Sequence, residues 1–512
     1  MALFAEVVGT SNRVALTSSR LDKVREIARH LAGLSADEIA VATPYLSGDI
    51  RQGRLNLGFA ALQAARNDPA AAPTLTLREV DRIFDALKRV KGKGAAEQRS
   101  ALLRELFRRA TAEEQDFLVR LIVGELRQGA LEGLMVEAVA AAAELPPTDV
   151  RRAVAFAGAI APVAAAALSG GATALAQFSV QLMQPVLPML AQPAEDMAAA
   201  LGALGTALVE WKLDGARVQV HKNGDDVRIY TRNLNDVTSR APEIVAVVRE
   251  TRAQSLILDG EAIALRANGR PHPFPVTMSR FGSQQDSAAK RSELPLSVFF
   301  FDCLYRDGAM LFDHPTRERR DALTAALPAK LVTPALVTAE VGEAERFYQQ
   351  ALGAGHEGVM AKALDAPYEA GRRGAGWLKV KRARTLDLVV LAAEWGHGRR
   401  RGWLSNLHLG ARDPATGGFV MLGKTFKGMT DALLAWQTEE LQKRAIQRDE
   451  WVVQVRPELV VEIAFNDLQE SSQYPGGLAL RFARVKGYRP DKRPEEADTI
   501  DAVRRIYEES VA

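Results

Sequence analysis

The spacing of apolar residues divides the chain into three stretches. Up to about residue 175, apolar positions recur every three to four residues, alanine is frequent and short polar breaks separate the segments, which predicts helices. From there to about residue 384, short apolar runs alternate with helical segments, which predicts a mixed α+β region. After Arg384 the apolar runs are strand-like, as at residues 386–391, 407–409 and 458–463, and they suit a small β-barrel.

We therefore predict a multidomain protein with an all-α region at residues 1–175, an α+β region at 176–384 and a β-barrel region at 385–512. The length supports this division, because a chain of 512 residues exceeds what one hydrophobic core usually organises. Residues 183–194, with Pro185 and Pro188, are interpreted as a proline-punctuated linker between the first two regions.

One apolar stretch, residues 153–176, resembles a membrane span in its content of alanine, valine and leucine. Pro162, Gly170 and Gly171 interrupt it and alanine is only weakly apolar, so we predict a buried helix pair joined by a Ser-Gly-Gly turn. The first residues lack the basic start and apolar core of a signal peptide. We expect a cytoplasmic protein with no membrane association.

Composition excludes several classes of protein. A hydrophobic content of 47% and a charged content of 25% are ordinary globular values, and a net charge of +3 alone says little about nucleic acid. The single cysteine, Cys303, excludes a disulfide framework and a cysteine-rich zinc site, and its apolar neighbours predict an inert core position. The 7 histidines lack the spacing of a metal-binding pair.

The segment Glu-Trp-Lys-Leu-Asp-Gly-Ala-Arg at residues 210–217 carries the most informative chemistry. Lys212 follows an apolar strand-like run, strand alternation places Lys212 and Asp214 on one face, and Gly215 permits a tight bend. A lysine in a dry pocket beside other cations has a lowered pKa and can attack phosphorus, which points to covalent nucleotidyl transfer. The alternative is an exposed lysine at a strand end, followed by an ordinary Asp-Gly turn.

This segment resembles motif I of the covalent nucleotidyltransferases, which comprise ATP-dependent DNA ligases, RNA ligases and mRNA capping enzymes. Further segments resemble the family's other motifs and occur in the family's order. They are Thr231-Arg232-Asn233 after motif I, Leu258-Asp259-Gly260-Glu261 for motif III, Phe299-Phe300-Phe301-Asp302 for motif IIIa, Glu357–Lys362 for motif IV, Trp377–Lys381 for motif V, and Leu480–Arg484 continuing to Asp491-Lys492 for motif VI.

The residue types in these segments fit transfer at phosphorus. The reaction needs cations around the phosphoryl oxygens, and it needs carboxylates to hold Mg²⁺. We predict that the cations are Lys212, Arg217, Arg232, Lys379 and Lys381, that Glu261 and Glu357 are the metal ligands, that Phe301 offers an aromatic face to adenine, and that Glu210 hydrogen-bonds the base.

Each segment also has an ordinary structural interpretation. Leu-Asp-Gly-Glu is usually a hairpin turn, and a run of three phenylalanines is usually core, as we expect for two of these three. Lys379 and Lys381 alternate about an apolar residue, as in any edge strand with one wet face. Only the joint order of the segments favours the functional interpretation.

The resemblance implies further roles. It implies that Arg217 and Glu261 contact the ribose, that Arg232 contacts the phosphates, and that Arg373 binds the nucleotide. It also implies that motif VI, with Arg481, Arg484, Asp491 and Lys492, lies on a mobile OB-fold domain, and that the cations of the motif reach the pyrophosphate when that domain closes. Gly487 departs from the pattern, which tends to have an arginine there, although Lys486 is adjacent.

Two kinds of segment point to DNA. Residues 118–129, which end with Arg127-Gln128-Gly129, resemble part of the helical DNA-binding domain of larger ATP-dependent DNA ligases. Basic loops are suited to phosphate contacts, and two occur here. One loop contains Lys91 and Lys93; an alternative interpretation of this segment is a solvated helix end without a role in binding. The other loop contains Arg399, Arg400 and Arg401 between glycines.

The resemblance narrows to the ATP-dependent DNA ligase family. NAD-dependent ligases carry a four-cysteine zinc finger, and capping enzymes and RNA ligases usually lack so long a helical domain. The resemblance implies an ATP-grasp-like adenylation domain between the helical domain and an OB-fold, with ATP as co-substrate, Mg²⁺ or Mn²⁺ as metal, and nicked double-stranded DNA as partner of a monomer. It leaves open an RNA ligase, a capping-type guanylyltransferase or an inactive nick-binding protein, and does not distinguish replication, repair and recombination.

Overall fold

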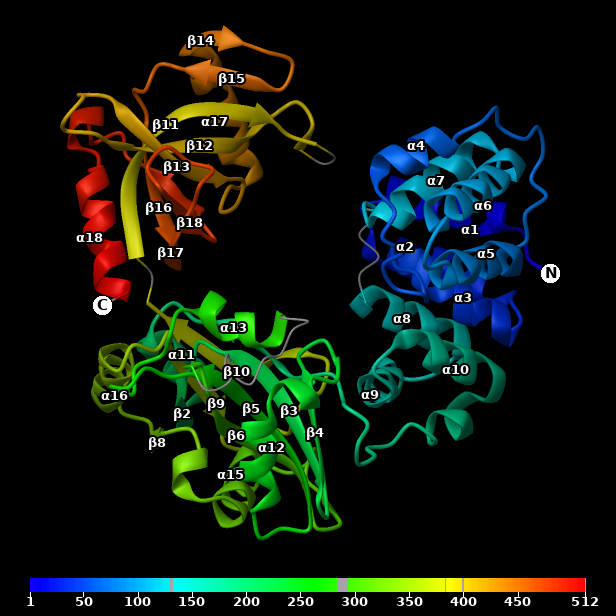
Figure 1. Ribbon diagram of the computed structural model, residues 1–512, viewed down its shortest axis with the longest axis horizontal. Helices are drawn as coiled ribbons and strands as arrows, with labels where there is room; N and C mark the ends of the chain where they lie inside the picture. Colours follow the sequence, from blue (N-terminus) through cyan, green and yellow to red (C-terminus); the bar gives the residue numbers. More distant parts are fainter. Residues whose placement is uncertain (127, 129–131, 283–292, 383, 398–399, 512) are drawn as a thin grey trace.

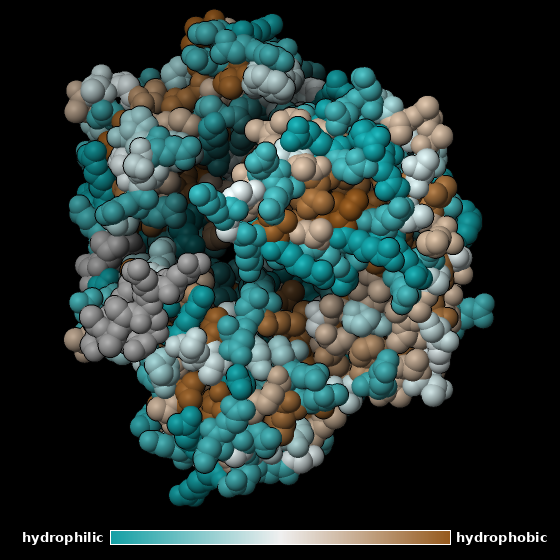
Figure 2. Space-filling view, turned by 45° about the vertical axis from the view of Figure 1, so that its right-hand side comes forward, coloured by the Kyte–Doolittle hydropathy of each residue, from teal (hydrophilic) through white to brown (hydrophobic). Residues whose placement is uncertain are grey.

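The chain forms three lobes in the computed structural model, which describes residues 1–126, 128, 132–282, 293–382, 384–397 and 400–511 (Figure 1). Helices form the first lobe, two sheets with helices form the second, and strands dominate the third. Figure 2 shows a hollow near the centre of one face, where the lobes meet, with mostly hydrophilic side chains around it. The predicted succession of a helical region, a sheet-rich region and C-terminal strands is confirmed.

The helical lobe packs around one continuous hydrophobic core. Phe4 lies at its centre, in edge-to-face contact with Tyr45 at 6.3 Å and with Phe117 at 5.6 Å between ring centroids. Thr76 begins α5 and Thr111 begins α7, each with a reciprocal capping box. The helices are α1 (Phe4–Leu16), α2 (Arg20–Ala32), α3 (Ala36–Ser47), α4 (Phe59–Ala65), α5 (Leu77–Arg89), α6 (Ala95–Arg109), α7 (Ala112–Val123), α8 (Glu132–Ala143), α9 (Pro147–Ala157) and α10 (Ile160–Leu175).

The apolar stretch at residues 153–176 is helical and is interrupted at two places. Gly171, in the predicted Ser-Gly-Gly turn, has non-helical angles (φ 57°, ψ −145°) and kinks α10, and a further break, which was not predicted, lies at Gly158, where α9 ends with a φ of 73°. Gly158 can adopt this left-handed conformation because it has no Cβ. Within the described residues, no helix has both the length and the apolar character needed to cross a membrane.

The segment predicted as a linker connects the first two lobes and is hydrogen-bonded to the second. The N–H of Met183 donates to Nδ1 of His221 at 3.1 Å, and the N–H of Val186 donates to the side chain of Gln219 at 2.8 Å. Residues Leu190–Pro193 form β1, which pairs in parallel with β10. The prolines fit because they lie between or at the edge of these contacts, where no ladder hydrogen bond is lost.

The second lobe contains two sheets. Strands β1, β10, β9, β2 and β8 form one sheet in that order, and β4, β3, β5, β6 and β7 form the other. The strands are β1 (Leu190–Pro193), β2 (Ala207–Lys212), β3 (Ala216–Asn223), β4 (Asp226–Thr231), β5 (Ser255–Ala264), β6 (Leu296–Arg306), β7 (Ala309–Met310), β8 (Ala335–Thr338), β9 (Gly358–Ala363) and β10 (Arg373–Lys381). The helices are α11 (Met197–Leu204), α12 (Pro242–Arg249), α13 (Phe274–Gly282), α15 (Thr316–Ala326) and α16 (Val341–Gly353).

The third lobe is built around β11, which pairs with β12, β15 and β16 along its length. The strand-like runs predicted from the sequence fall within β11, β12 and β16. The elements are β11 (Arg384–Trp395), β12 (Leu404–Arg412), β13 (Phe419–Thr425), α17 (Asp431–Lys443), β14 (Ala445–Arg448), β15 (Val452–Val455), β16 (Val460–Phe465), β17 (Asp467–Glu470), β18 (Leu478–Arg481), β19 (Arg484–Tyr488) and α18 (Ile500–Val511).

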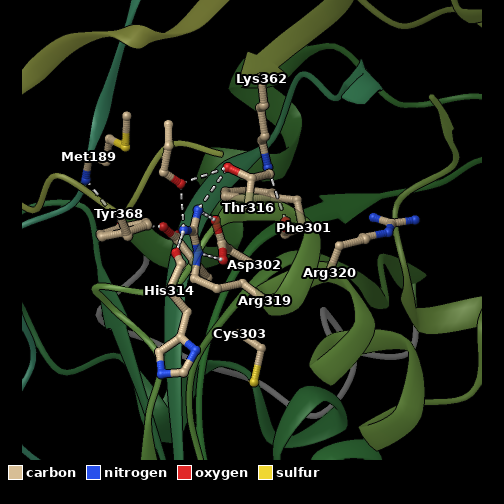
Figure 3. A network of polar contacts seen from close by, with 12 residues as sticks. Met189, Phe301, Asp302, Cys303, His314, Thr316, Arg319, Arg320, Lys362 and Tyr368 are labelled. Atoms are coloured by element: carbon tan, nitrogen blue, oxygen red, sulfur yellow. Dashed lines mark hydrogen bonds and ion pairs between the residues drawn. The ribbon is translucent and has the colours of Figure 1, made fainter. Parts of the chain in front are cut away.

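A buried ion pair joins α15 to β6 in the second lobe (Figure 3). Arg319, with 0% of its side chain exposed, donates to both oxygens of Asp302 at 2.7 and 3.1 Å. Its remaining N–H groups donate to the backbone oxygens of His314 and Ala366. Every polar group of this guanidinium therefore depends on partners that the fold supplies, and the loss of one leaves a buried charge.

We predict that Asp302→Asn lowers the free energy of unfolding of the second lobe by about 3–5 kcal/mol, because Arg319 loses its counter-charge while it stays buried. Urea titration combined with hydrogen exchange of peptides from α15 measures the change. Asp313→Asn is the matched control, because Asp313 also binds an arginine, Arg152, with both oxygens but is 62% exposed. The control should cost no more than about 1 kcal/mol. Equal losses in the two variants would contradict the assignment.

Candidate functional site

A cleft of about 550 Å³ lies between the two sheets of the second lobe, with α13 along one side. Strands β2, β9, β10 and β1 line it from one sheet, and β3, β5, β6 and the residues after β4 line it from the other. The lining includes most of the residues predicted to act on a nucleotide: Glu210, Lys212, Arg217, Arg232, Glu261, Phe301, Arg373, Lys379 and Lys381.

Lys212 is the last residue of β2 and lies opposite Gly358, the first residue of β9. The N–H of Glu357 donates to the backbone oxygen of Lys212 at 3.1 Å, so the strand pairing fixes Glu357 beside it. The Glu357 carboxylate forms an ion pair with Nζ of Lys212 and another, at 2.7 Å, with Nζ of Lys381. Segments far apart in the sequence thus meet in one group of charges.

Two glycines allow the strands around Lys212 to approach closely. A Cβ on Gly358 would lie 2.2 Å from the backbone oxygen of Val380, and one on Gly215 would lie 2.4 Å from that of Ala262. Both distances are far below van der Waals contact. Gly215 therefore serves close packing of β3 against β5, in addition to the bend predicted from the sequence.

The expectation that Lys212 has a lowered pKa is wrong for the protein without ligand. Burial alone would lower the pKa of Lys212, but the carboxylates of Glu357 and Glu261 outweigh burial and raise it. The sequence could not reveal this balance, because it depends on which carboxylates the fold places around the amine. Without a ligand, Lys212 carries a proton that it must lose before it can act as a nucleophile.

Two carboxyl groups near Lys212 hold protons more tightly than usual. Burial raises the pKa of Glu261 to about 7, against the opposing effect of Lys212 and Arg217. Burial, together with the charge of Glu357, raises the pKa of Asp214 to about 6. Buried groups with shifted pKa values in a cleft are typical of a functional site.

Cations also gather in the cleft, beside the pair of Lys212 and Glu357. Burial lowers the pKa of Lys379, and the charges of Lys381, Arg373 and Lys212 lower it further. Burial and the charge of Lys212 also lower the pKa of Lys381. Arg373 and Arg232 are exposed at the rim of the cleft. Mutual repulsion among these cations would be relieved by a polyanion, so this group of cations is suited to phosphates.

Arg217 is anchored more firmly than the sequence suggested. It donates to both oxygens of Asp259, at 3.0 and 2.6 Å, to the backbone oxygen of Met189 at 2.6 Å, and to the Tyr368 hydroxyl at 3.2 Å. The Tyr368 hydroxyl in turn donates to Asp259 and accepts from the N–H of Met189. Asp259 lies within the motif III segment, but nothing in the sequence signalled Tyr368 or Met189.

Phe301 lies on β6 and is partly exposed to the cleft, as predicted, whereas Phe300 is buried in the core. Phe299 is only partly buried, so the expectation of two core phenylalanines was wrong. Trp377 from β10 meets Phe301 edge to face at 6.1 Å between ring centroids and also lines the cleft. The tryptophan was visible in the motif V segment, but its part in the cleft was not inferred.

Glu210 lines the cleft with both carboxylate oxygens already in use. Arg320 contacts one oxygen at 2.8 Å and Lys362 contacts the other at 2.5 Å. Lys362 ends the motif IV segment and Arg320 lies on α15, in a helix with several charged residues. The sequence gave no sign of either contact, because nothing distinguishes Arg320 from its charged neighbours before the helix is placed.

The motif VI residues are only partly at the cleft. The Arg481 guanidinium lies 5.6 Å from the ring of Phe274, which lines the cleft. Arg484 is exposed at the start of β19. Asp491 is paired with Arg489, and Lys492 is paired with Asp387 of β11, within the third lobe. Gly487, where the motif departs from the family pattern, pairs with Glu462 between β19 and β16.

The candidate DNA contacts within the described residues are not part of the cleft lining. Lys91 and Lys93 are exposed in the loop between α5 and α6. Arg401 is exposed between β11 and β12, and Arg400 donates to the backbone oxygen of Phe426. Arg127 and Arg399 lie outside the described residues.

Among the described residues, no group of three or more histidine, cysteine, aspartate or glutamate side chains is arranged to hold a metal ion. Glu261 and Glu357 nevertheless both lie close enough to Lys212 to raise its pKa. A pair of carboxylates fits Mg²⁺, which keeps several waters and takes one or two protein carboxylates.

Three family models match the chain in order. "DNA ligase N terminus" matches residues 23–140, "ATP dependent DNA ligase domain" matches residues 188–381, and "ATP dependent DNA ligase C terminal region" matches residues 400–492. The first match covers helices of the first lobe, the second covers the cleft, and the third covers most of the third lobe.

Curated proteins match over nearly the whole chain. A "Probable DNA ligase" of Anaeromyxobacter sp. (strain Fw109-5) is 60% identical over 511 residues, covering 99% of this chain and 98% of that protein. A "Probable DNA ligase" of Sorangium cellulosum (strain So ce56) is 55% identical over 512 residues, covering 100% and 96%. The solved structure "Pmar-Lig_PreS3" has a TM-score of 0.63 at 18% identity, covers 94% of this chain and 99% of that chain, and shows similarity of fold.

We predict that Glu357→Gln lowers the pKa of Lys212, because burial remains and the largest charge that raises the pKa is removed. The neutral fraction of Lys212 at a fixed mildly alkaline pH should rise, about tenfold for each decrease of one in the pKa. The rate at which an amine-reactive reagent labels Lys212 in the ligand-free protein, followed by peptide mass spectrometry across pH, measures this. Glu340→Gln, at an exposed glutamate before α16, is the control and should leave the profile in place. A Glu357→Gln profile displaced to higher pH would contradict the account of these charges.

Proposed function

The chain belongs to the ATP-dependent DNA ligase family, and we propose that Lys212 is the residue that ATP adenylates. The protein is thus an enzyme that uses ATP and acts on DNA. The three matched models are those of DNA ligases, so nothing favours the RNA ligase and capping-enzyme alternatives, and the prediction of a DNA ligase is confirmed.

The observation that carries the proposal is the position of Lys212 in the cleft. Its amine pairs with the carboxylate of Glu357, which also pairs with Lys381, and Lys379 lines the same cleft. In the proposed first step, neutral Nζ of Lys212 forms a bond to the α-phosphorus of ATP, and the bond from that phosphorus to pyrophosphate breaks. AMP then passes to the 5′-phosphate at a nick, and the 3′-hydroxyl of the nick displaces AMP to form the phosphodiester bond.

The other cleft residues suit the parts of ATP. Phe301 offers a ring to adenine and Glu210 an acceptor to its amino group, while Arg217 and Glu261 face the ribose. Arg232, Arg373, Lys379 and Lys381 suit the phosphates, because preorganised cations stabilise the charge that develops on transferring phosphoryl oxygens.

We propose Glu261 and Glu357 as the ligands of Mg²⁺, with Mn²⁺ as an alternative. A bound divalent cation supplies charge neutralisation at these carboxylates and at the phosphates. The raised pKa of Glu261, which reflects its burial, would fall when a cation lies beside it. Removal of the carboxylate charge from around Lys212 would also favour the neutral amine that the first step requires.

We propose that the third lobe is an OB-fold that moves relative to the second. Arg384 begins β11 directly after the second lobe and is the expected hinge. Arg481 is the motif VI residue that already reaches the rim of the cleft, at Phe274. Arg484 and Lys492 would approach the pyrophosphate only after further movement, and Lys492 would have to leave Asp387. Asp491 orients Arg489 in the present arrangement.

The helical lobe is proposed to hold the nicked duplex. Exposed Lys91 and Lys93 are suited to phosphate contacts, and the arginine loop between β11 and β12 offers a second basic surface. We propose that the enzyme works as a monomer on nicked DNA in the cytoplasm, at the nucleoid. The substrate and co-substrate support this location.

We predict that Lys212→Ala abolishes the labelled protein adduct formed from α-labelled ATP and all nick sealing from ATP, because no other cleft amine holds this position. Lys212→Arg should fail in the same way, since guanidinium stays protonated. Lys330→Ala, at an exposed lysine of the same lobe, should retain both activities. An adduct of normal yield in Lys212→Ala would refute the assignment.

We predict that Arg481→Ala slows adenylation of Lys212 on the order of 10²-fold, the usual effect of removing one group that stabilises transition-state charge. The same variant should join a nick that already carries AMP at nearly the normal rate, because pyrophosphate plays no part in that step. Arg504→Ala, at an exposed arginine of α18, is the control and should change neither rate. Equal losses in the two reactions would show instead that Arg481 supports the fold or binds DNA.

A further inference from the structure

Glu210 is held by two cations from separate elements. Oε1 of Glu210 accepts from Nη1 of Arg320 on α15 at 2.8 Å, and Oε2 lies 2.5 Å from Nζ of Lys362 on β9. The side chains of Glu210 and Lys362 are 2% and 1% exposed, so water competes little with these contacts. The carboxylate therefore has one orientation, fixed from both sides.

Each of the two cations is in turn fixed by the second lobe. Nη2 of Arg320 donates to the backbone oxygen of Thr333 at 2.8 Å. Nζ of Lys362 donates to the backbone oxygen of Phe301 at 3.0 Å, and it lies 4.4 Å from the ring centroid of Trp377. Figure 3 shows Lys362 reaching toward Phe301 while Arg320 extends from α15 at a distance from that contact.

The arrangement controls what Glu210 can offer a base. A carboxylate whose two oxygens each face a cation offers the cleft acceptors only, and it offers no donor. Adenine carries an amino group, a donor, at the position where guanine carries a carbonyl oxygen, an acceptor. A fixed acceptor therefore pairs with adenine and repels guanine.

We propose that Arg320 and Lys362 are the positioning residues that set the preference of this enzyme for ATP over GTP, acting through Glu210. This inference rests on the proposed adenylation of Lys212 in the same cleft. Arg320 acts from behind the cleft, since it contacts Glu210 without being part of the cleft lining. Lys362 contacts Glu210 from within the cleft lining, beside Phe301 and Trp377.

Loss of Arg320 frees one oxygen of Glu210. The carboxyl group can then turn, or carry a proton on that oxygen and donate to the carbonyl of guanine. Either change should lower the selectivity for ATP over GTP, while the catalytic groups around Lys212 stay in place. A site that loses a fixed hydrogen-bonding partner discriminates less between related substrates, by factors of about ten to several hundred.

The test compares Arg320→Gln with Arg317→Gln, an exposed arginine of the same helix that pairs with Asp365. The rate of adduct formation is measured with α-labelled ATP, GTP and ITP, which shares the carbonyl of guanine but lacks its amino group. The ratio of kcat/KM for ATP to that for GTP should fall about ten- to a hundredfold in Arg320→Gln, mainly through KM, with ITP following GTP. Arg317→Gln should keep the ratio of the unmodified enzyme.

Two further variants separate positioning from loss of structure. In a Glu210→Gln background, adding Arg320→Gln should change the ATP-to-GTP ratio no further, because the effect of Arg320 passes through Glu210. Arg320→Lys should restore part of the ratio, and Lys362→Met should lower it as Arg320→Gln does. Joining of a nick that already carries AMP reports the integrity of the rest of the enzyme and should stay near normal in Arg320→Gln.

An unchanged ratio in both Arg320→Gln and Lys362→Met, with a normal adduct from ATP, would overturn this inference and leave the proposed function intact. A uniform loss of all activities, including joining of the pre-adenylated nick, would assign the two cations a structural role and would also overturn it. Absence of any adduct on Lys212 in the unmodified enzyme would instead refute the proposed function itself.

Discussion

The antiparallel pairing of β2 with β9 is the constraint on which the site depends. Its register places Lys212 opposite Gly358 and Glu210 opposite Met360, and so it brings two distant segments of the chain together. Glu357, directly before β9, and Lys362, within β9, each contact a charged group of β2. A register slip of one residue would turn these side chains to the other face of the sheet and would separate every pair.

The charges assembled in this way are unequal along the cleft. The carboxylates around Lys212 outweigh its burial and raise its pKa. Burial lowers the pKa of Lys379, and the cations around it lower that pKa further. A ligand that carries both a divalent cation and phosphates complements both kinds of charge. The protein without ligand therefore keeps Lys212, the proposed nucleophile, protonated.

Much of the cleft was predictable from the sequence, because the family motifs are short and each keeps its chemistry within a few residues. Lys212, Glu261, Phe301 and Lys379 were identified in this way, and the structure brings them to one cleft. The contacts that were missed join elements distant in sequence: Arg320 with Glu210, and Tyr368 with Arg217. Such pairs depend on how helices and strands are placed, which local pattern does not encode. The predicted decrease in the pKa of Lys212 was wrong for the same reason, because the carboxylates that raise this pKa come from distant segments.

The fold shows a similar division. Apolar periodicity predicted the helical lobe and the strands of the third lobe, since each pattern reflects a local period. At residues 183–194 the prolines predicted a linker, and the pattern did not reveal that β1 and its flanking residues are hydrogen-bonded to the second lobe. The side chains of His221 and Gln219 accept hydrogen bonds from the backbone of this segment. The sequence alone assigned neither side chain that role.

The central claim is that the charge group at the junction of β2 and β9 makes Lys212 the nucleophile. Incubation of the full chain with ATP and Mg²⁺, followed by proteolysis and peptide mass spectrometry, tests it most directly. The account predicts one AMP for each chain, attached to the peptide that contains Lys212 and sensitive to acid as a phosphoramide. AMP attached to another residue, or efficient sealing of nicks with no adduct at any stage, would contradict it.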